Sequence, residues 1–130
     1  MTRRRCLKTV VLTGTAGALG AAPAAERAIQ LHVDLDVDPA REKTLLETYR
    51  NEFRPAIRKQ PGFVDVRLMK LVSAPAGQAP PNTNYRLLVS FEKEEQRKAW
   101  VATETHQKLW PLMEKNLRSV KYNAVLFQIV

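Results

Sequence analysis

The sequence lacks several patterns that commonly carry enzyme chemistry. Its single cysteine, Cys6, leaves no partner for a disulfide within the chain. There is no glycine-rich loop of the kind that holds nucleotide phosphates, no serine-centred nucleophile motif and no zinc-ligand spacing. The one apolar run near the start is shorter than the roughly 20 residues that a transmembrane helix needs. These absences argue against nucleotide hydrolases, serine hydrolases, zinc proteins and membrane-spanning proteins.

Residues 1–25 differ in composition from the rest of the chain. Residues 2–8 are basic and include the pair Arg3-Arg4, residues 9–20 are apolar but diluted by glycine and threonine, and residues 22–24 form a small-residue cleavage pattern. This arrangement resembles a twin-arginine export signal. A disordered basic N-terminus and a short membrane anchor are the alternatives.

We therefore expect residues 1–25 to be a signal peptide and residues 26–130 to be one exported domain, periplasmic or extracellular. Cleavage after Ala24 removes four basic residues and no acidic one, which lowers the formal charge from +8 to +4. Cys6 leaves with the signal, so no thiol nucleophile remains. The twin-arginine route carries folded proteins, so this resemblance implies a domain that folds before export.

The exported part begins with an alternating segment. In residues 29–37 apolar side chains occupy every second position, and His32, Asp34 and Asp36 share the opposite face, which predicts a strand. Asp38-Pro39 supplies a helix N-cap and a first-turn proline. The helix that follows has an apolar stripe composed of Leu45, Leu46, Tyr49, Phe53 and Ile57. Pro55 should kink or locally end this helix near residues 53–54.

Two further strands are predicted after the Pro61-Gly62 turn. Residues 63–72 alternate, which places Phe63 and Met69 on the face opposite Val64 and Leu68. Residues 73–83 form a loop rich in proline and glycine, and Tyr85–Phe91 is the next strand.

The last third of the sequence predicts two helical pieces and a strand. The first piece is residues 92–102 and the second is residues 106–117, with Thr105 as its cap. Pro111 lies within the second piece and should make its first turn irregular. Residues 119–129 are the final strand.

The order strand, helix, strand, strand, helix, strand predicts an α+β fold of the ferredoxin-like type. Its antiparallel four-stranded sheet would carry both helices on one face. The other face would be open, and the strands have apolar residues on both sides. A homodimer that packs sheet against sheet, as an α+β barrel, would cover that face.

Pro61-Gly62-Phe63 at the start of the second strand, and Ala99-Trp100 with His106 after the third, resemble the antibiotic biosynthesis monooxygenase domain family. The resemblance spans residues 29–129 and implies a dimeric α+β barrel. The family includes cofactor-independent monooxygenases that oxidise polyphenols to quinones, haem-degrading enzymes, and domains with no established reaction. It therefore implies oxidation of a small phenolic or quinol-type substrate by O₂ without a cofactor.

The haem-degrading branch of the family has an Asn on the first strand, and a Trp on the second helix followed by a His ten residues later. Here Trp100 matches the Trp, but Trp110 stands ten residues on, His106 is only six residues away, and the first strand has no Asn. Haem binding is therefore the weaker alternative. A second alternative is a barrel that binds a small ligand, or acts in stress, without catalysis.

His106 is the preferred catalytic residue, because oxidation of a phenol needs a base and an imidazole titrates near neutral pH. Trp100 would be a pocket wall and orient the substrate, and Trp110 would be a second wall. The remaining candidates for substrate contact are Tyr85, Phe53 and His32. In the alternative, structural interpretation, His106 begins a helix and the aromatic residues belong to the core.

The sequence gives less support to two other kinds of site, one for a metal ion and one for nucleic acid. His32, Asp34 and Asp36 could hold a metal, but residues two apart on a strand are about 6.6 Å apart, which is awkward for one compact site. The basic residues at positions 54, 58, 59, 67 and 70 raise the question of nucleic acid. However, Tyr85–Phe91 has no glycine, unlike the third strand of RNA-recognition modules with this strand order.

Overall fold

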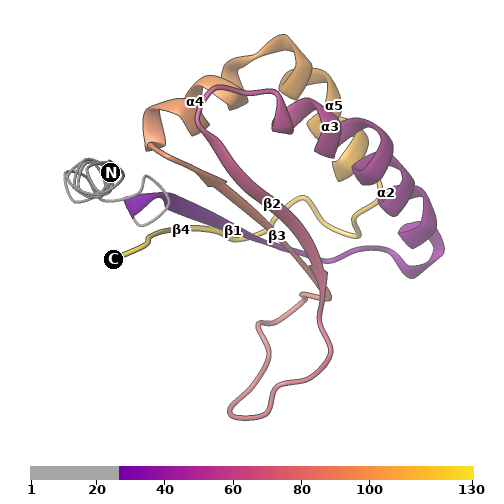
Figure 1. Ribbon diagram of the computed structural model, residues 1–130. Helices are drawn as coiled ribbons and strands as arrows, with labels where there is room; N and C mark the ends of the chain where they lie inside the picture. The colour runs from indigo at the N-terminus through magenta and orange to yellow at the C-terminus, as the bar shows by residue number, and fades with distance from the viewer. Residues whose placement is uncertain (1–26) are drawn as a thin grey trace, which may run out of the picture.

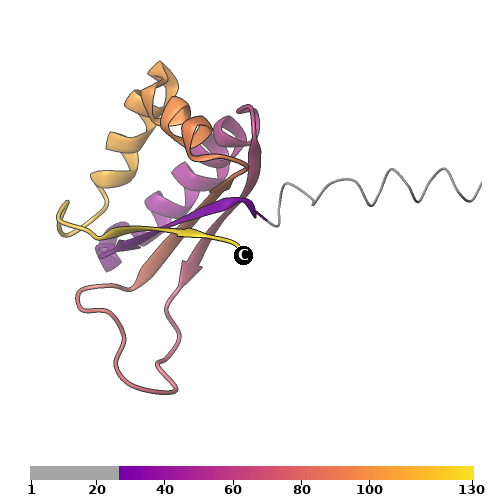
Figure 2. The ribbon, with the colours of Figure 1, turned by 90° about the vertical axis from the view of Figure 1, so that its left-hand side faces the viewer.

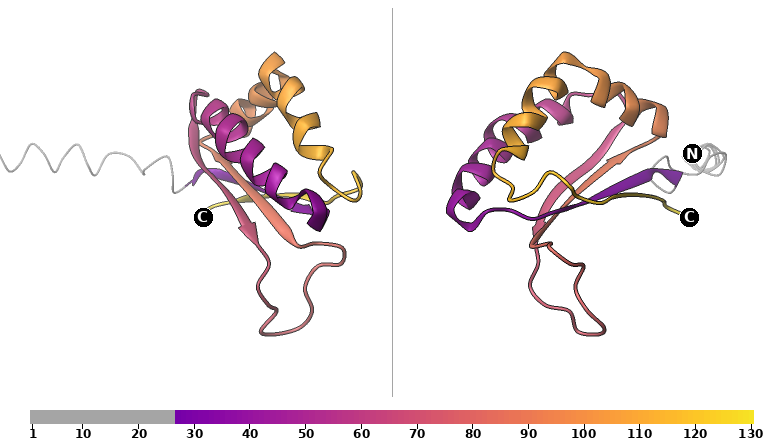
Figure 3. Two further views of the ribbon diagram at one scale, coloured as in Figure 1. Left: turned by 90° about the vertical axis from the view of Figure 1, so that its right-hand side faces the viewer. Right: turned by 180° about the vertical axis from the view of Figure 1, so that it is seen from behind.

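A four-stranded antiparallel sheet forms the centre of the computed structural model, which describes residues 27–130. Strand β1 (Ile29–Leu35) lies between β3 (Tyr85–Phe91) and β4 (Ala124–Gln128), and β2 (Phe63–Lys70) pairs with the other edge of β3. The helices cover one face of the sheet (Figure 1). Turned views show the opposite face without a covering helix in this part of the chain (Figures 2 and 3). The predicted ferredoxin-like fold is confirmed.

The predicted signal peptide, residues 1–25, lies outside the described residues. Within residues 27–130, no helix combines the length and the apolar character needed to cross a membrane.

The helical segment between β1 and β2 is built from four short pieces. They are η2 (Pro39–Arg41), α2 (Glu42–Thr48), the π-helical turn η3 (Tyr49–Phe53) and α3 (Arg54–Arg58). The Asp38 side chain accepts a hydrogen bond from Ala40 N at 3.0 Å, as the sequence predicts. At Pro55 the segment does not end: it widens into the π turn just before the proline. Since proline has no N–H and its ring crowds the preceding turn, this widening is the local disturbance that Pro55 imposes.

In strand β2, Phe63 lies on the face of the sheet opposite to the predicted one. Phe63 pairs with Phe91, and the next paired residue is Asp65 with Ser90, so a β-bulge interrupts the alternation. Phe63 therefore lies on the core face and packs edge-on against Phe91, with 6.2 Å between ring centroids. Before it, Gly62 has φ +79°, and a Cβ there would lie 2.0 Å from the Gln96 side chain. This position requires glycine.

Of the two later helices, the first begins two residues later than predicted, and the second begins two residues earlier and has a different cap. The helices are α4 (Glu94–Ala102) and α5 (Glu104–Glu114). Thr103, not Thr105, caps α5: its hydroxyl accepts a hydrogen bond from His106 N at 3.1 Å. Pro111 lies inside α5, and the first turn is regular. Thr105 is helical because Thr103 has the extended backbone that an N-cap requires.

The chain between α5 and β4 is irregular where a longer strand is predicted. Val37 forms an isolated bridge with Leu117, and Arg118 pairs with Asp36 at 2.7 Å. Residues 119–123 then leave the sheet, and regular pairing resumes only at Ala124. This departure turns the side chain of Tyr122 toward the helices, where it packs against the core.

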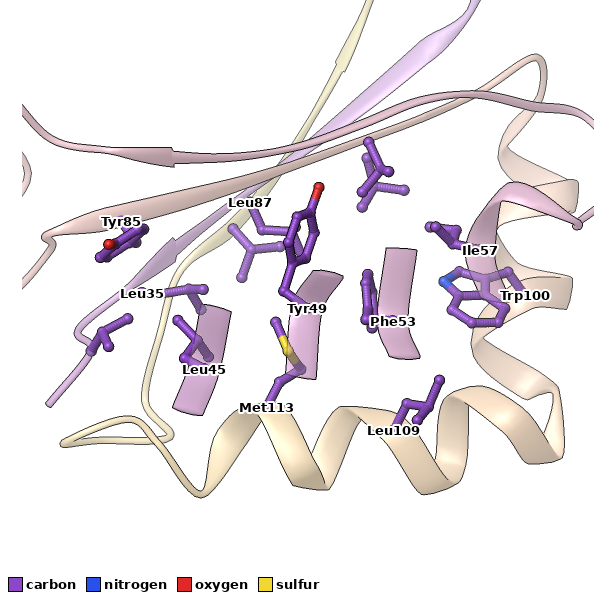
Figure 4. Packing of buried hydrophobic residues seen from close by; sticks show 14 of the residues in the cluster. Leu35, Leu45, Tyr49, Phe53, Ile57, Tyr85, Leu87, Trp100, Leu109 and Met113 are labelled. Atoms are coloured by element: carbon purple, nitrogen blue, oxygen red, sulfur yellow. The ribbon is translucent and has the colours of Figure 1, made fainter. Parts of the chain in front are cut away.

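The core lies between the sheet and the helices that cover it (Figure 4). Side chains from α2, η3 and α3 meet those of α4 and α5 above the apolar face of β1 and β3. The most deeply buried apolar residues include Leu35, Val37, Leu45, Phe53, Ile57, Leu87, Phe91, Trp100 and Met113. The loop of residues 71–84 projects beyond the ends of β2 and β3, away from this core (Figure 1).

Candidate functional site

An apolar cavity of about 260 Å³ lies between the sheet and the second helical pair. Its floor comes from β1, β3 and the start of β4, and its walls come from η3, α4, α5 and the segment that precedes β4. The residues around it are Leu31, Val33, Phe53, Leu87, Val89, Arg97, Trp100, Val101, His106, Trp110, Tyr122 and Ala124. A volume of this size suits a small molecule of one or a few rings.

Thr103 fixes the backbone between α4 and α5, the two helices that form one wall of this cavity. Its hydroxyl donates a hydrogen bond to Trp100 O at 2.7 Å and accepts one from His106 N at 3.1 Å. One side chain thereby ends α4 next to Trp100 and begins α5 next to His106. The break between the two helices is what brings residues six apart in sequence into the same wall.

The His106 ring is enclosed by aromatic side chains. The Trp100 indole meets it edge-on at 5.1 Å between ring centroids, and the Trp110 ring stacks on it at 6.0 Å with an interplanar angle of 15°. Phe53 supports both indoles, at 5.9 Å from Trp100 and 6.0 Å from Trp110. These contacts hold the imidazole in one orientation beside the cavity.

The electrostatics of His106 favour its neutral form. Burial lowers the pKa of the imidazole below its usual 6.5, the charge of Arg97 lowers it further, and Glu114 opposes both. Its Nδ1 is buried and has no hydrogen-bond partner among residues 27–130. Because a neutral imidazole has one nitrogen that accepts a proton, His106 has the properties of a base at neutral pH.

Arg97 brings a fixed positive charge to the cavity, and the sequence interpretation did not include it. Its Nε and Nη2 donate hydrogen bonds to the two carboxylate oxygens of Glu94, each at 2.6 Å. Glu94 raises the pKa of Arg97, so the guanidinium stays charged. The i,i+3 spacing of the two residues on a helix was the signal that could have identified this pair.

Tyr122 is the second residue that the sequence interpretation missed. Trp110 Nε1 donates a hydrogen bond to the Tyr122 hydroxyl at 2.8 Å, and that hydroxyl donates to Glu114 Oε2 at 2.9 Å. Burial, more than any other effect, raises the pKa of Tyr122, so it remains a neutral donor. The chain of hydrogen bonds fixes the Trp110 indole, which is stacked on His106.

Four of the predicted site residues line this cavity together: His106, Trp100, Trp110 and Phe53. Tyr85 lies elsewhere, near the projecting loop, and its hydroxyl donates a hydrogen bond to Glu42. Burial raises the pKa of Tyr85 to about 12, with a further contribution from Glu42.

His32 lies on the open face of the sheet, away from the cavity. Its Nε2 is 3.2 Å from Gln30 Oε1, and its ring packs edge-on against Phe127 with 5.1 Å between centroids. Its neighbours Asp34 and Asp36 form ion pairs with Arg86 and Arg118, each at 2.7 Å. Residues 27–130 contain no group of three His, Cys, Asp or Glu placed to hold a metal ion.

Comparison with solved structures identifies the fold. A conserved protein from Methanosarcina mazei Go1 is 12% identical, with TM-score 0.67 over 82% of this chain and 97% of its own. A candidate antibiotic biosynthesis monooxygenase from Bordetella bronchiseptica is 20% identical, with TM-score 0.65 over 80% and 98%. A dimeric ferredoxin-like protein of unknown function from Jannaschia sp. CCS1 is 16% identical, with TM-score 0.65 over 77% and 97%. The chain has the fold of these proteins.

Comparison of the sequence alone identifies no family. No family model matches the chain, and no curated protein matches it either. At these sequence identities the similarity to solved structures shows the fold alone, and evidence for a reaction comes from the cavity.

Proposed function

We propose that the cavity binds a small phenolic or quinol-type aromatic molecule and that the protein oxidises it with O₂ without a cofactor. One observation carries this proposal: a partly buried imidazole, kept neutral by its lowered pKa, borders an aromatic cavity. The name of the Bordetella bronchiseptica protein, a candidate monooxygenase with the same fold, supports it.

In the proposed reaction, His106 takes a proton from the substrate and leaves an electron-rich anion. The anion gives an electron to O₂, the two radicals combine in a C–O bond, and the peroxide takes back the proton. Loss of water then leaves a carbonyl, so one oxygen atom enters the product and the other leaves as water. All the electrons come from the substrate. Arg97 would stabilise the anion through its charge, while Trp100 and Trp110 hold the ring.

A ligand-binding protein without catalysis is the alternative that fits the same cavity. Haem fits less well: the cavity is about 260 Å³, whereas sites for drug-sized molecules are roughly 300–1,000 Å³, and a porphyrin is a large ligand. In addition, the His106 ring is packed between two indoles, which hinders its approach to a macrocycle. No step of the proposed reaction therefore involves haem.

The direct test is to incubate purified, metal-free protein with a panel of phenols and anthrones in air and under nitrogen. We expect turnover in air, consumption of one O₂ per product, and no turnover under nitrogen. Binding without O₂ consumption would favour the ligand-binding alternative. A Soret band that grows to one haem per chain would contradict the assignment of a cofactor-free cavity.

We also propose that the chain forms a homodimer through the open face of the sheet. On that face Phe127 and Val125 are 54% and 47% exposed, and Met69 on the opposite edge strand is 38% exposed. Apolar side chains this exposed on one sheet face are typical of an interface. The name of the Jannaschia protein, which describes a dimer of this fold, supports the proposal.

Replacing Phe127 with aspartate is expected to convert the dimer to a monomer, because a charge would be buried against the apolar partner face. Light scattering at micromolar concentration measures the mass. The control is Val120→Asp, which adds the same charge at an exposed apolar residue off the sheet and should leave the dimer intact. A monomeric mass for the unmodified protein would contradict the proposal.

A further inference from the structure

A second, basic groove lies at the β2 edge of the molecule, apart from the His106 cavity. It has a volume of about 480 Å³ and runs between β2 and the helical segment of α2, η3 and α3. Arg50, Arg54 and Arg58 border it from the helical side, and Asp65 and Arg67 border it from the strand. Four guanidinium groups therefore surround a space that contains one carboxylate.

The positive charge of this groove is mostly uncompensated. Arg50, Arg54 and Arg58 are four residues apart and lie along one side of the helical segment, about 6 Å per step. Among residues 27–130 none of these three is within salt-bridge distance of a carboxylate, whereas Arg67 pairs with Asp65 at 2.7 Å. Arg54 is held over the Tyr49 ring, 5.7 Å from its centroid.

A tyrosine that is almost fully buried borders the same groove. Tyr49 is only 5% exposed, lines the groove, and has no hydrogen-bond partner for its hydroxyl among the described residues. Figure 4 shows this hydroxyl directed toward the strands and away from α5. Burial raises the pKa of Tyr49 despite the opposing charges of Arg54, Arg58 and Arg67, so the hydroxyl remains a donor at neutral pH. The hydroxyl is therefore free to donate a hydrogen bond to an acceptor in the groove.

We propose that this groove binds a phosphate group carried by an organic molecule, with Arg54, Arg58 and Arg67 around the phosphate and the Tyr49 hydroxyl donating to it. A phosphate monoester suits the site because it carries nearly two charges and three acceptor oxygens, whereas one carboxylate is satisfied by a single arginine. The groove is larger than a phosphate. Leu46 and Leu68, which also line it, would contact the organic part.

The test is isothermal titration calorimetry of the full chain with phenyl phosphate, at fixed ionic strength. We expect one site per chain. Arg54→Gln and Arg58→Gln should each weaken binding by about 10-fold or more, because each removes a charge-assisted hydrogen bond. Tyr49→Phe, which removes only the hydroxyl, should weaken it by about 3- to 10-fold. The control is Lys59→Gln, which removes a neighbouring exposed charge outside the groove and should change affinity less than about 2-fold.

Vesicles distinguish a soluble phosphate ester from a lipid headgroup. Binding to phosphatidic acid vesicles but not to phosphatidylcholine vesicles, with the same order of variants and no binding of phenyl phosphate, would assign the phosphate to a lipid. Equal losses in Lys59→Gln and Arg58→Gln would overturn the site and leave only general charge screening. Binding of an RNA oligomer alone, or of no probe, would overturn it too. Thermal unfolding by circular dichroism shows that each variant is folded.

Discussion

His106→Ala is expected to reduce the O₂-dependent turnover by about 10²- to 10⁴-fold, the contribution typical of a positioned general base. The reason is local: the imidazole is the one at the cavity, and burial and Arg97 lower its pKa, so that it is neutral and able to accept a proton. The measurement is O₂ consumption with whichever phenol or anthrone turns over fastest. Ligand affinity should change much less, because Trp100 and Trp110 remain to hold the aromatic ring.

The chain provides its own control for this variant. It contains two histidines, and the second, His32, also has a buried Nδ1 without a partner in the described part of the chain. His32 lies on the other face of the sheet, so His32→Ala should leave turnover per active site nearly unchanged. Full activity in His106→Ala, or equal losses in the two variants, would contradict the assigned base.

The pH profile supplies an independent readout of the same residue. Burial and Arg97 lower the pKa of His106 below 6.5, so the imidazole is already neutral at pH 7. Since the base must be neutral to accept a proton, kcat/KM should be level at alkaline pH and fall as the pH drops through the lowered pKa. An Arg97→Gln variant should move this fall toward higher pH, because one of the two effects that lower the pKa is removed.

The fold was predictable because each element carries a local signal. Alternation in residues 29–35 and in Tyr85–Phe91 marks the two central strands, and Asp38-Pro39 marks the start of the helix between them. Errors arose where the chain departs from a regular period. The bulge after Phe63 reverses the face of that residue, and the irregular residues 119–123 shorten the last strand. The alternation of apolar and polar residues along a strand does not reveal where a β-bulge inserts an extra residue.

The cavity was only partly predictable, for a different reason. Trp110 is near His106 in space because it lies one helical turn further along α5, and Trp100 is near it because α4 and α5 meet at the extended residue Thr103. Tyr85 lies at the far end of its strand, and alternation indicates the face of a sheet but not the position along it. Tyr122 reaches the cavity from an irregular segment, through a hydrogen bond to Trp110 that no sequence pattern specifies.

Phe53→Ala is expected to lower the free energy of unfolding by about 3–5 kcal/mol, a large share of the roughly 5–15 kcal/mol typical of a domain. Phe53 is 1% exposed and contacts the rings of Tyr49, Trp100 and Trp110, with centroid distances of 6.3, 5.9 and 6.0 Å. It also stands in the π-helical turn before Pro55, on the buried side of the helical segment. The removed ring therefore leaves both a cavity and two indoles without support.

Chemical denaturation at fixed protein concentration measures this loss, and the melting temperature should fall by more than about 12 °C. The matched control is Phe53→Leu, which keeps most of the buried apolar volume and should cost less than half as much. In a folded Phe53→Ala protein the enlarged cavity should also weaken binding of the aromatic substrate, because Trp100 and Trp110 lose the ring that positions them. A loss below 1 kcal/mol would mean that Phe53 does not hold the cavity walls in place.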